Sequence, residues 1–457
     1  MSENLSKEEK AILKDIAKKE KENIIETSFI ETDNYIVEQI DAKKPRFCLY
    51  NKNTESIEYV KHVEFDGKEY IPINDNLVKK GFIQLPTEAQ EYGTDKDLTD
   101  EIADYFYTNF EVPQFFEMFL PYLVMFYWVY EKFPFIPYTH FVGLTGTGKT
   151  TAQEAFGAIC YKPIDVAGAV TMASIFRVAT QWRGTLLLDE FEPNGDAYKE
   201  IVLLLKTGVG NKALLRTEGD KEKKVEVYTV KSPKVFTSEK PVNDAGLQSR
   251  TLTIQMSKTK RSIPLYKLEE DYDKAQEIRN KLLLWRLRHL NKIDLRSFKY
   301  GFEELKAFDR RVQQVITPIY YLSDNITRES IVQFAIKQEA ETKRERQESI
   351  EGQIFYYIAN NADPITLVNI TSFLNEDRNN LQKVSEKKTA NLIRKIFGLE
   401  IKREGHDNKR VIVTDGQEEK LYQLSEYFSI PLARFASVAE VAENEEQKPE
   451  EQQTIFL

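Results

Sequence analysis

The sequence of 457 residues is poor in side chains that bind metals or form cross-links, with two cysteines and four histidines. Cys48 and Cys160 lack the spacing of a zinc site, and two cysteines cannot build a disulfide scaffold in so long a chain. The histidines are scattered as well. This composition argues against a metal cluster and is typical of a protein from a reducing cytoplasm.

The sequence also lacks a long apolar run and an excess of positive charge. Its most apolar stretch, FLPYLVMFYWVY at 119–130, lies between acidic residues and contains Pro121. It is too short to cross a bilayer, which predicts a buried helix and no membrane partner. The N-terminus is charged throughout and has no signal-peptide core. The net charge of −9 gives no global signal for nucleic acid, so such a surface would have to be a local basic patch.

The texture of the sequence changes several times, and its length allows about two or three domains. Strands alternate with helices in the middle of the chain, which predicts a mostly parallel sheet. A later run of three helices and a β-hairpin is the outline of a winged helix, with Ser385 as the N-cap of its third helix. The predicted segments are a charged helical arm at 1–28, a small β-rich N-terminal domain at 29–96 with a hairpin turn in FDGKEY, a helical collar at 97–137, an α/β core at 138–263, a helical lid and linker at 264–347, the winged helix at 348–414, and a C-terminal helix with an acidic flexible tail at 415–457.

A glycine-rich loop between an apolar strand and a helix carries the strongest chemical signal. Gly143–Thr150 reads GLTGTGKT and fits the pattern GxxxxGK followed by Ser or Thr in full. In this pattern backbone N–H groups turn toward phosphates, Lys149 meets the β- and γ-phosphates, and the Thr150 hydroxyl is a ligand for Mg²⁺. We therefore expect ATP and Mg²⁺ at Gly143, Leu144, Thr145, Gly146, Thr147, Gly148, Lys149, Thr150 and Thr151.

A second buried strand, in TLLLDEFE, ends at two adjacent acids. Asp189 is placed to complete the Mg²⁺ shell, and Glu190 to orient and deprotonate a water that attacks the γ-phosphate. Two acids in this position favour hydrolysis over phosphoryl transfer to another substrate. The pattern thus predicts an ATPase rather than a kinase.

Two basic features follow the acids. The run ALLRTEGDKEKKVEVYTV at 213–230 predicts a β-hairpin whose tip lysines, Lys221, Lys223 and Lys224, either contact a phosphate backbone or form a solvated turn. Arg250 directly precedes another strand. It is either an arginine finger that reaches the γ-phosphate of a neighbouring subunit or a structural ion pair.

Taken in order, the phosphate loop, LLLDEFE, the basic hairpin, the strand KVFTS and the SR before a strand resemble the AAA+ helicases with a pre-sensor hairpin. These include the superfamily 3 helicases and the minichromosome-maintenance-like helicases of phages, plasmids and mobile elements. The resemblance covers about residues 100–414 and implies an α/β fold: an AAA+ P-loop ATPase core with a parallel sheet and helical flanks, in addition to the β-rich N-terminal domain and the C-terminal winged helix.

The resemblance also implies roles for individual residues. Lys149, Glu190 and Arg250 would be catalytic, and the tip lysines would contact single-stranded or forked DNA inside a head-to-tail, hexameric ring. The family usually has an Asn after the third strand to sense the γ-phosphate. Here Ser238 is the nearest candidate, with Glu239 or Lys240 as substitutes.

Two further segments suggest partners. SEKKTANLIRK is the expected recognition helix of the winged helix, where Lys387 and Lys388 either contact duplex DNA or belong to a helix that only packs. Gln452–Leu457 resembles the peptides that bind the bacterial sliding clamp, or is a frayed terminus. Two other functions remain open for the whole chain: a replication initiator or loader that does not unwind DNA, and a signalling or defence P-loop NTPase.

Overall fold

The computed structural model describes residues 23–433, apart from gaps at 167–171, 191–195, 211–212, 219–223, 243, 265–268, 295, 297–300, 363, 377, 379–381 and 407. The chain forms two compact units, Met1–Ala335 and Ile336–Leu457. Each helix in the described part of the chain is too short or too polar to cross a membrane.

A five-stranded parallel sheet forms the centre of the first unit. The three strands at the centre of the sheet, YTHFV, LLL and KVFTS, are buried along their whole length, and only LLL is a continuous apolar run. The prediction of a parallel sheet is confirmed. In spatial order the strands are β14 (Thr251–Gln255), β8 (Tyr138–Val142), β13 (Lys234–Ser238), β10 (Leu186–Leu188) and β9 (Ile164–Val166).

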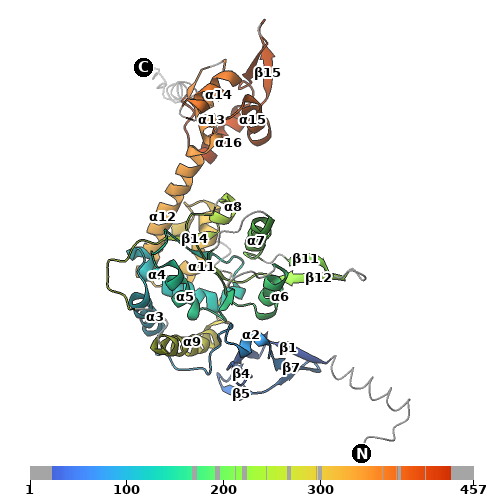
Figure 1. Ribbon diagram of the computed structural model, residues 1–457, viewed down its shortest axis with the longest axis vertical. Helices are drawn as coiled ribbons and strands as arrows, with labels where there is room; N and C mark the ends of the chain where they lie inside the picture. The colour runs from blue at the N-terminus through green and yellow to red at the C-terminus, as the bar shows by residue number, and fades with distance from the viewer. Residues whose placement is uncertain are drawn as a thin grey trace, which may run out of the picture. The chain divides into compact units, whose positions relative to one another are not determined.

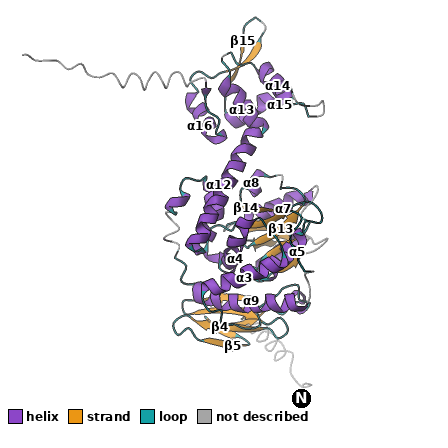
Figure 2. Cartoon of the chain, turned by 90° about the vertical axis from the view of Figure 1, so that its left-hand side faces the viewer, coloured by secondary structure: helices purple, strands orange, loops and turns teal. Residues whose placement is uncertain are grey.

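Helices connect these strands and cover the sheet (Figures 1 and 2). The apolar run predicted to be a buried helix lies in α4, where every residue from 119 to 128 is buried around Pro121. The longer helices are α3 (Asp95–Asn109), α4 (Gln114–Trp128), α5 (Lys149–Ala158), α6 (Met172–Trp182), α7 (Asp196–Thr207), α9 (Glu269–His289) and α11 (Arg310–Leu322). Shorter elements are α2 (Asn76–Lys79), α8 (Ala245–Gln248) and 3-10 turns at Tyr130–Lys132 and Glu303–Leu305.

The N-terminal strands form two small sheets. The predicted turn in FDGKEY is confirmed, since Asp66 and Gly67 adopt φ angles of 51° and 71° between β6 and β7, as a tight hairpin requires. The helical arm predicted at 1–28 lies mostly outside the described residues, and its end is a strand instead: residues 24–27 form β1, which pairs with β7. The strands are β1 (Ile24–Thr27), β2 (Phe29–Glu31), β3 (Tyr35–Ile40), β4 (Arg46–Asn51), β5 (Ile57–Val60), β6 (Val63–Phe65) and β7 (Lys68–Pro72).

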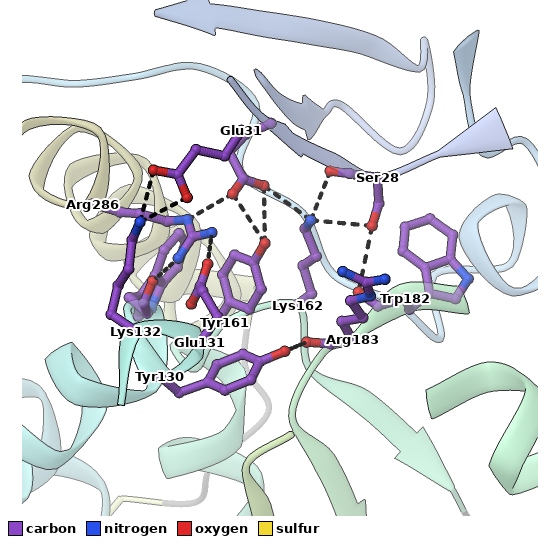
Figure 3. A network of polar contacts seen from close by, with 12 residues as sticks. Ser28, Glu31, Tyr130, Glu131, Lys132, Tyr161, Lys162, Trp182, Arg183 and Arg286 are labelled. Carbon is purple, nitrogen blue, oxygen red and sulfur yellow. Dashed lines mark hydrogen bonds and ion pairs between the residues drawn. The ribbon is translucent and has the colours of Figure 1, made fainter. Parts of the chain in front are cut away.

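A buried ion network joins these strands to the α/β core (Figure 3). The Glu38 carboxylate on β3 accepts from Arg286 Nε of α9 at 2.6 Å, and lies 2.9 Å from Lys162 Nζ. The Tyr161 hydroxyl donates to the same carboxylate at 3.0 Å. Burial lowers the pKa of Lys162 to about 8 against the opposing effect of Glu38. Since removal of one partner would leave a buried charge unpaired, the network holds the strands to the core.

The second unit has its own hydrophobic core. The predicted N-cap is confirmed, because the Ser385 side chain accepts from the Lys388 N–H. The helix after 414 supplies Leu421 and Phe428 to this core, so the boundary predicted at 414 falls inside the unit. After α12 (Asn325–Glu348), the elements are α13 (Ile350–Asn360), α14 (Leu367–Asn375), α15 (Glu386–Leu392), a π-helical turn (Ile393–Phe397), β15 (Ile401–Glu404), β16 (Lys409–Ile412) and α16 (Glu418–Phe428).

Candidate active site

The phosphate loop lies between β8 and α5, at the carboxyl edge of the parallel sheet. Gly148 is the N-cap of α5 with a φ of 82°, and no side chain caps this helix. The first N–H groups of α5 are therefore free of a side-chain cap and suit a phosphate oxygen. At the other end of the loop, a Cβ on Gly143 would lie 2.6 Å from the Met256 carbonyl oxygen. The loop thus passes too close to the end of β14 for a side chain.

The loop is closed on itself. Lys149 Nζ donates to the Leu144 carbonyl at 3.1 Å, and the Thr147 hydroxyl donates to the same oxygen at 2.8 Å. Leu144, Thr145 and Gly146 are exposed, while Thr151 is half-buried in the first turn of α5. The Lys149 ammonium therefore lies over the loop, where it could exchange a carbonyl partner for a phosphate oxygen.

The two predicted acids follow β10 at the same edge of the sheet. Asp189 Oδ1 lies 3.3 Å from the Thr150 hydroxyl, so the structure brings the two predicted Mg²⁺ ligands together. A hydroxyl and a carboxylate are the hard oxygen ligands that Mg²⁺ prefers. Glu190 is exposed beside them and adopts a φ of 47°, which is uncommon for a residue with a side chain. These residues fit ATP with Mg²⁺.

The three candidate sensors, Ser238, Glu239 and Lys240, lie at the end of β13, and the side chains of Ser238 and Glu239 have different surroundings. Ser238 is buried, and its Oγ lies 2.7 Å from His140 Nε2 and also contacts the Lys240 carbonyl, so it faces the neighbouring strand. The Glu239 carboxylate instead accepts a hydrogen bond from Thr145 of the phosphate loop. The structure therefore brings the side chain of Glu239 into contact with the phosphate loop, whereas Ser238 contacts the loop through its backbone carbonyl, which accepts from the Gly143 N–H at 3.2 Å.

Sequence reasoning missed Thr237, which precedes these candidates on β13. Its hydroxyl donates to Asp189 Oδ1 at 2.6 Å, and the Glu190 N–H donates to it at 2.9 Å. The signal for it in the sequence is weak, because Thr237 is one of three polar residues in the strand KVFTS. Only the pairing of β10 with β13 shows that this residue faces both acids.

Arg250 lies at the opposite edge of the sheet. It directly precedes β14, which runs parallel to β8 for five residues. Because a strand advances roughly 3.3 Å per residue, this places Arg250 about 16 Å from the loop edge. Its half-buried guanidinium donates to the Gly246 carbonyl, next to an ion pair of 2.7 Å between Lys206 and Asp244. Burial lowers the pKa of Arg250, with a further contribution from Arg311.

The predicted hairpin is confirmed as β11 (Ala213–Glu218) paired antiparallel with β12 (Lys224–Thr229), and it projects from the core (Figure 1). Tyr228 is buried at its base against Phe176 of α6. On the opposite face, Leu215 and Val227 are paired across the strands and are exposed. Of the tip lysines, Lys221 and Lys223 lie outside the described residues, and Lys224 begins β12.

In the second unit, the predicted basic residues Lys387 and Lys388 are exposed on α15. The hairpin of β15 and β16 adds a feature that the sequence did not single out. Arg403 and Arg410 are paired across it, and Arg410 contacts Glu386 at the start of α15. The hairpin and the basic helix are therefore neighbours. The predicted clamp peptide, Gln452–Leu457, lies outside the described residues.

The parallel sheet, the loop between β8 and α5 and the acids after β10 define a mixed α/β protein with features of a P-loop core. No family model matches the chain, and no curated protein resembles it in sequence. Among solved structures, the chain is similar to one described as the SCCmec type IV Cch active helicase, with 15% identity, a TM-score of 0.44, and coverage of 87% of this chain and 80% of that chain. It is also similar to the NrS-1 C-terminal region, with 12% identity, a TM-score of 0.37, and coverage of 83% and 96%. A JCV helicase is similar with 15% identity, a TM-score of 0.24, and coverage of 53% of this chain and 61% of that chain.

Proposed function

We propose that this chain is an ATP-dependent DNA helicase or translocase that acts in replication of a phage, plasmid or mobile element. One observation carries the proposal. The phosphate loop and the acids lie at one edge of the sheet, while Arg250 lies at the other edge, about 16 Å away by strand geometry. Such a site is completed by a second copy of the chain. The strand order β14-β8-β13-β10-β9 supports the assignment of an AAA+ core.

The residues of the chain divide the chemistry of hydrolysis between them. The N-terminus of α5 and Lys149 would bind the phosphates, and the Thr150 hydroxyl and Asp189 would hold Mg²⁺, which would neutralise phosphate charge when bound. Glu190 is exposed beside Asp189, so its carboxylate can accept the proton of an attacking water. Glu239, whose carboxylate accepts from the Thr145 hydroxyl of the loop, is the proposed sensor of the γ-phosphate and would act through that contact.

Arg250 implies the assembly. Arg250 lies at one edge of the sheet and the phosphate loop at the other, so copies of the chain would meet head to tail. Such contacts close into a ring when the rotation between subunits permits. We propose a hexamer in which Arg250 reaches the γ-phosphate bound by the neighbouring subunit. The rigid fork of a guanidinium suits this task because it stays charged and binds phosphate through two N–H groups.

The projecting hairpin is the proposed DNA-moving element. Its tip lysines would contact the backbone of single-stranded DNA, a binding mode that is sequence-tolerant and weakened by salt. The second unit is proposed as a winged helix that contacts the duplex arm of a fork through α15 and the adjacent Arg403. Gln452–Leu457 is proposed as a sliding-clamp peptide.

ATP turnover, measured with and without a single-stranded oligonucleotide, tests this proposal. Wild-type turnover should rise with the DNA. Glu190→Gln should still bind ATP, but its turnover should fall by at least roughly a hundredfold, because a general base contributes that factor or more. Glu303→Gln, an exposed carboxylate paired with Lys306, is the matched control and should behave as wild type. Equal turnover by Glu190→Gln would remove it from the chemistry, and turnover insensitive to DNA would favour a signalling or defence NTPase.

A further inference from the structure

The hydroxyl of Thr237 lies between the two acids. Thr237 is fully buried on β13, with its Oγ1 2.6 Å from Asp189 Oδ1 and 2.9 Å from the Glu190 nitrogen. A carboxylate only accepts hydrogen bonds and an N–H only donates them. Thr237 therefore gives its one proton to Asp189 and accepts the Glu190 N–H, so a single hydroxyl fixes both residues.

The Glu190 backbone is held in a conformation that needs such support. Its φ of 47° is in the left-handed region, which a residue with a side chain seldom adopts. Its N–H also lies 3.0 Å from Asp189 Oδ1, so it is held between that carboxylate oxygen and the Thr237 hydroxyl. An unusual backbone conformation persists where the surrounding structure holds it in place. Here the result is that the chain turns directly after Asp189 and leaves Glu190 exposed at the edge of the sheet.

The Asp189 carboxylate is held by one of its two oxygens. The Thr150 hydroxyl, the Thr237 hydroxyl and the Glu190 N–H all contact Oδ1. Within the described part of the chain, no hydrogen bond falls on Oδ2. The contact with Thr237 thus fixes the rotation of the carboxylate and leaves its second oxygen for the Mg²⁺ shell.

We infer that Thr237 is a positioning residue that sets Asp189 for Mg²⁺ and Glu190 for the attacking water at the same time. This inference rests on the proposed ATPase function and adds a residue to it. Partners that orient a metal ligand commonly change metal affinity or activity by about 10- to 100-fold when they are removed. The same loss is expected here, with both Mg²⁺ dependence and turnover affected, because one hydroxyl serves both acids.

Thr237→Val is the direct test, since it removes the hydroxyl and keeps nearly the same volume. Its kcat should fall roughly 10- to 100-fold and the Mg²⁺ concentration for half-maximal turnover should rise about tenfold. Thr237→Ser keeps the hydroxyl and should restore both values. Binding of a fluorescent ATP analogue without Mg²⁺ should be unchanged, because the phosphates are held by the loop. Thr139→Val is the matched control: its hydroxyl is also buried in a neighbouring strand, 2.8 Å from Tyr127 Oη, but it contacts neither acid.

The outcomes separate the two ideas. A wild-type protein that does not hydrolyse ATP would contradict the proposed function itself. An active wild type whose Thr237→Val variant keeps its kcat and its Mg²⁺ dependence would overturn the role of Thr237, as would equal losses in the Val and Ser variants. If circular dichroism shows that the Val variant does not fold, Thr237→Ala undergoes the same measurements with the same expected result.

Discussion

His140 should make the first unit sensitive to mild acid. It lies in β8, leading into the phosphate loop, and is 1% exposed. Its ring stacks on Phe236 at 4.5 Å between centroids, and its Nε2 lies 2.7 Å from Ser238 Oγ. Because the Ser238 hydroxyl gives its proton to the Lys240 carbonyl, the histidine must donate through Nε2. Burial lowers the pKa of His140 to about 3.

The sign of the effect follows from this depressed pKa. In the unfolded chain the imidazole gains a proton below its ordinary pKa of about 6.5, whereas the folded protein keeps it neutral down to about 3. The unfolded state therefore binds more protons in this window, and the free energy of unfolding falls as the pH falls. The limiting slope is about 1.4 kcal/mol per pH unit, which amounts to about 2 kcal/mol between about pH 7 and about pH 5.

Urea denaturation followed by tryptophan fluorescence reports the unfolding of the first unit, which contains His140. Trp128, Trp182 and Trp285 are all buried in the first unit and are the three tryptophans of the chain. His140→Gln keeps an N–H donor for Ser238 but cannot be protonated, so wild type should lose about 2 kcal/mol more than this variant between about pH 7 and about pH 5. His62→Gln, at an exposed histidine, should lose as much as wild type. Equal losses in wild type and His140→Gln would refute the reasoning.

The other predictions concern the buried network, the finger and the hairpin. Glu38→Gln leaves the buried Lys162 ammonium without its carboxylate partner, whereas Arg286 keeps Glu131, and should destabilise the first unit by about 3–5 kcal/mol in the same urea assay. Glu91→Gln, at an exposed ion pair with Arg288, should cost less than about 1 kcal/mol. Similar costs for both would contradict the account of the network. Arg250→Ala subunits mixed into wild type should lower ATP turnover more than in proportion to their share, and simple dilution would argue against a shared site. Neutralising the tip lysines should abolish stimulation by single-stranded DNA and spare basal turnover, and unchanged stimulation would exclude the hairpin from DNA contact.

Local patterns account for what could be predicted from the sequence. The phosphate loop, the acids after a buried strand and the Ser385 cap each depend on residues close together in the chain, and the structure forms each element as expected. The hairpin around the tip lysines is local in the same sense. Such elements are specified by turn geometry, capping and apolar periodicity within about 20 residues.

Long-range contacts account for what could not be predicted. Arg286 looked like any basic residue of a helix, yet it pairs with Glu38, which lies 248 positions earlier. Ser238 and Thr237 are neighbours in sequence, but strand pairing turns one toward His140 and the other toward Asp189. β9 was missed because its three residues, IDV, contain an acid and form no apolar run, unlike the equally short LLL of β10, which was predicted.

The central claim is that hydrolysis at this site moves DNA. It is tested most directly by displacement of a labelled strand from a forked duplex, with wild type and Lys149→Ala compared in the presence of ATP and Mg²⁺. We predict that wild type releases the strand only with ATP and that Lys149→Ala, which lacks the ammonium over the phosphate loop, releases none. DNA-stimulated ATP turnover by wild type without any released strand would contradict it and favour an initiator or loader.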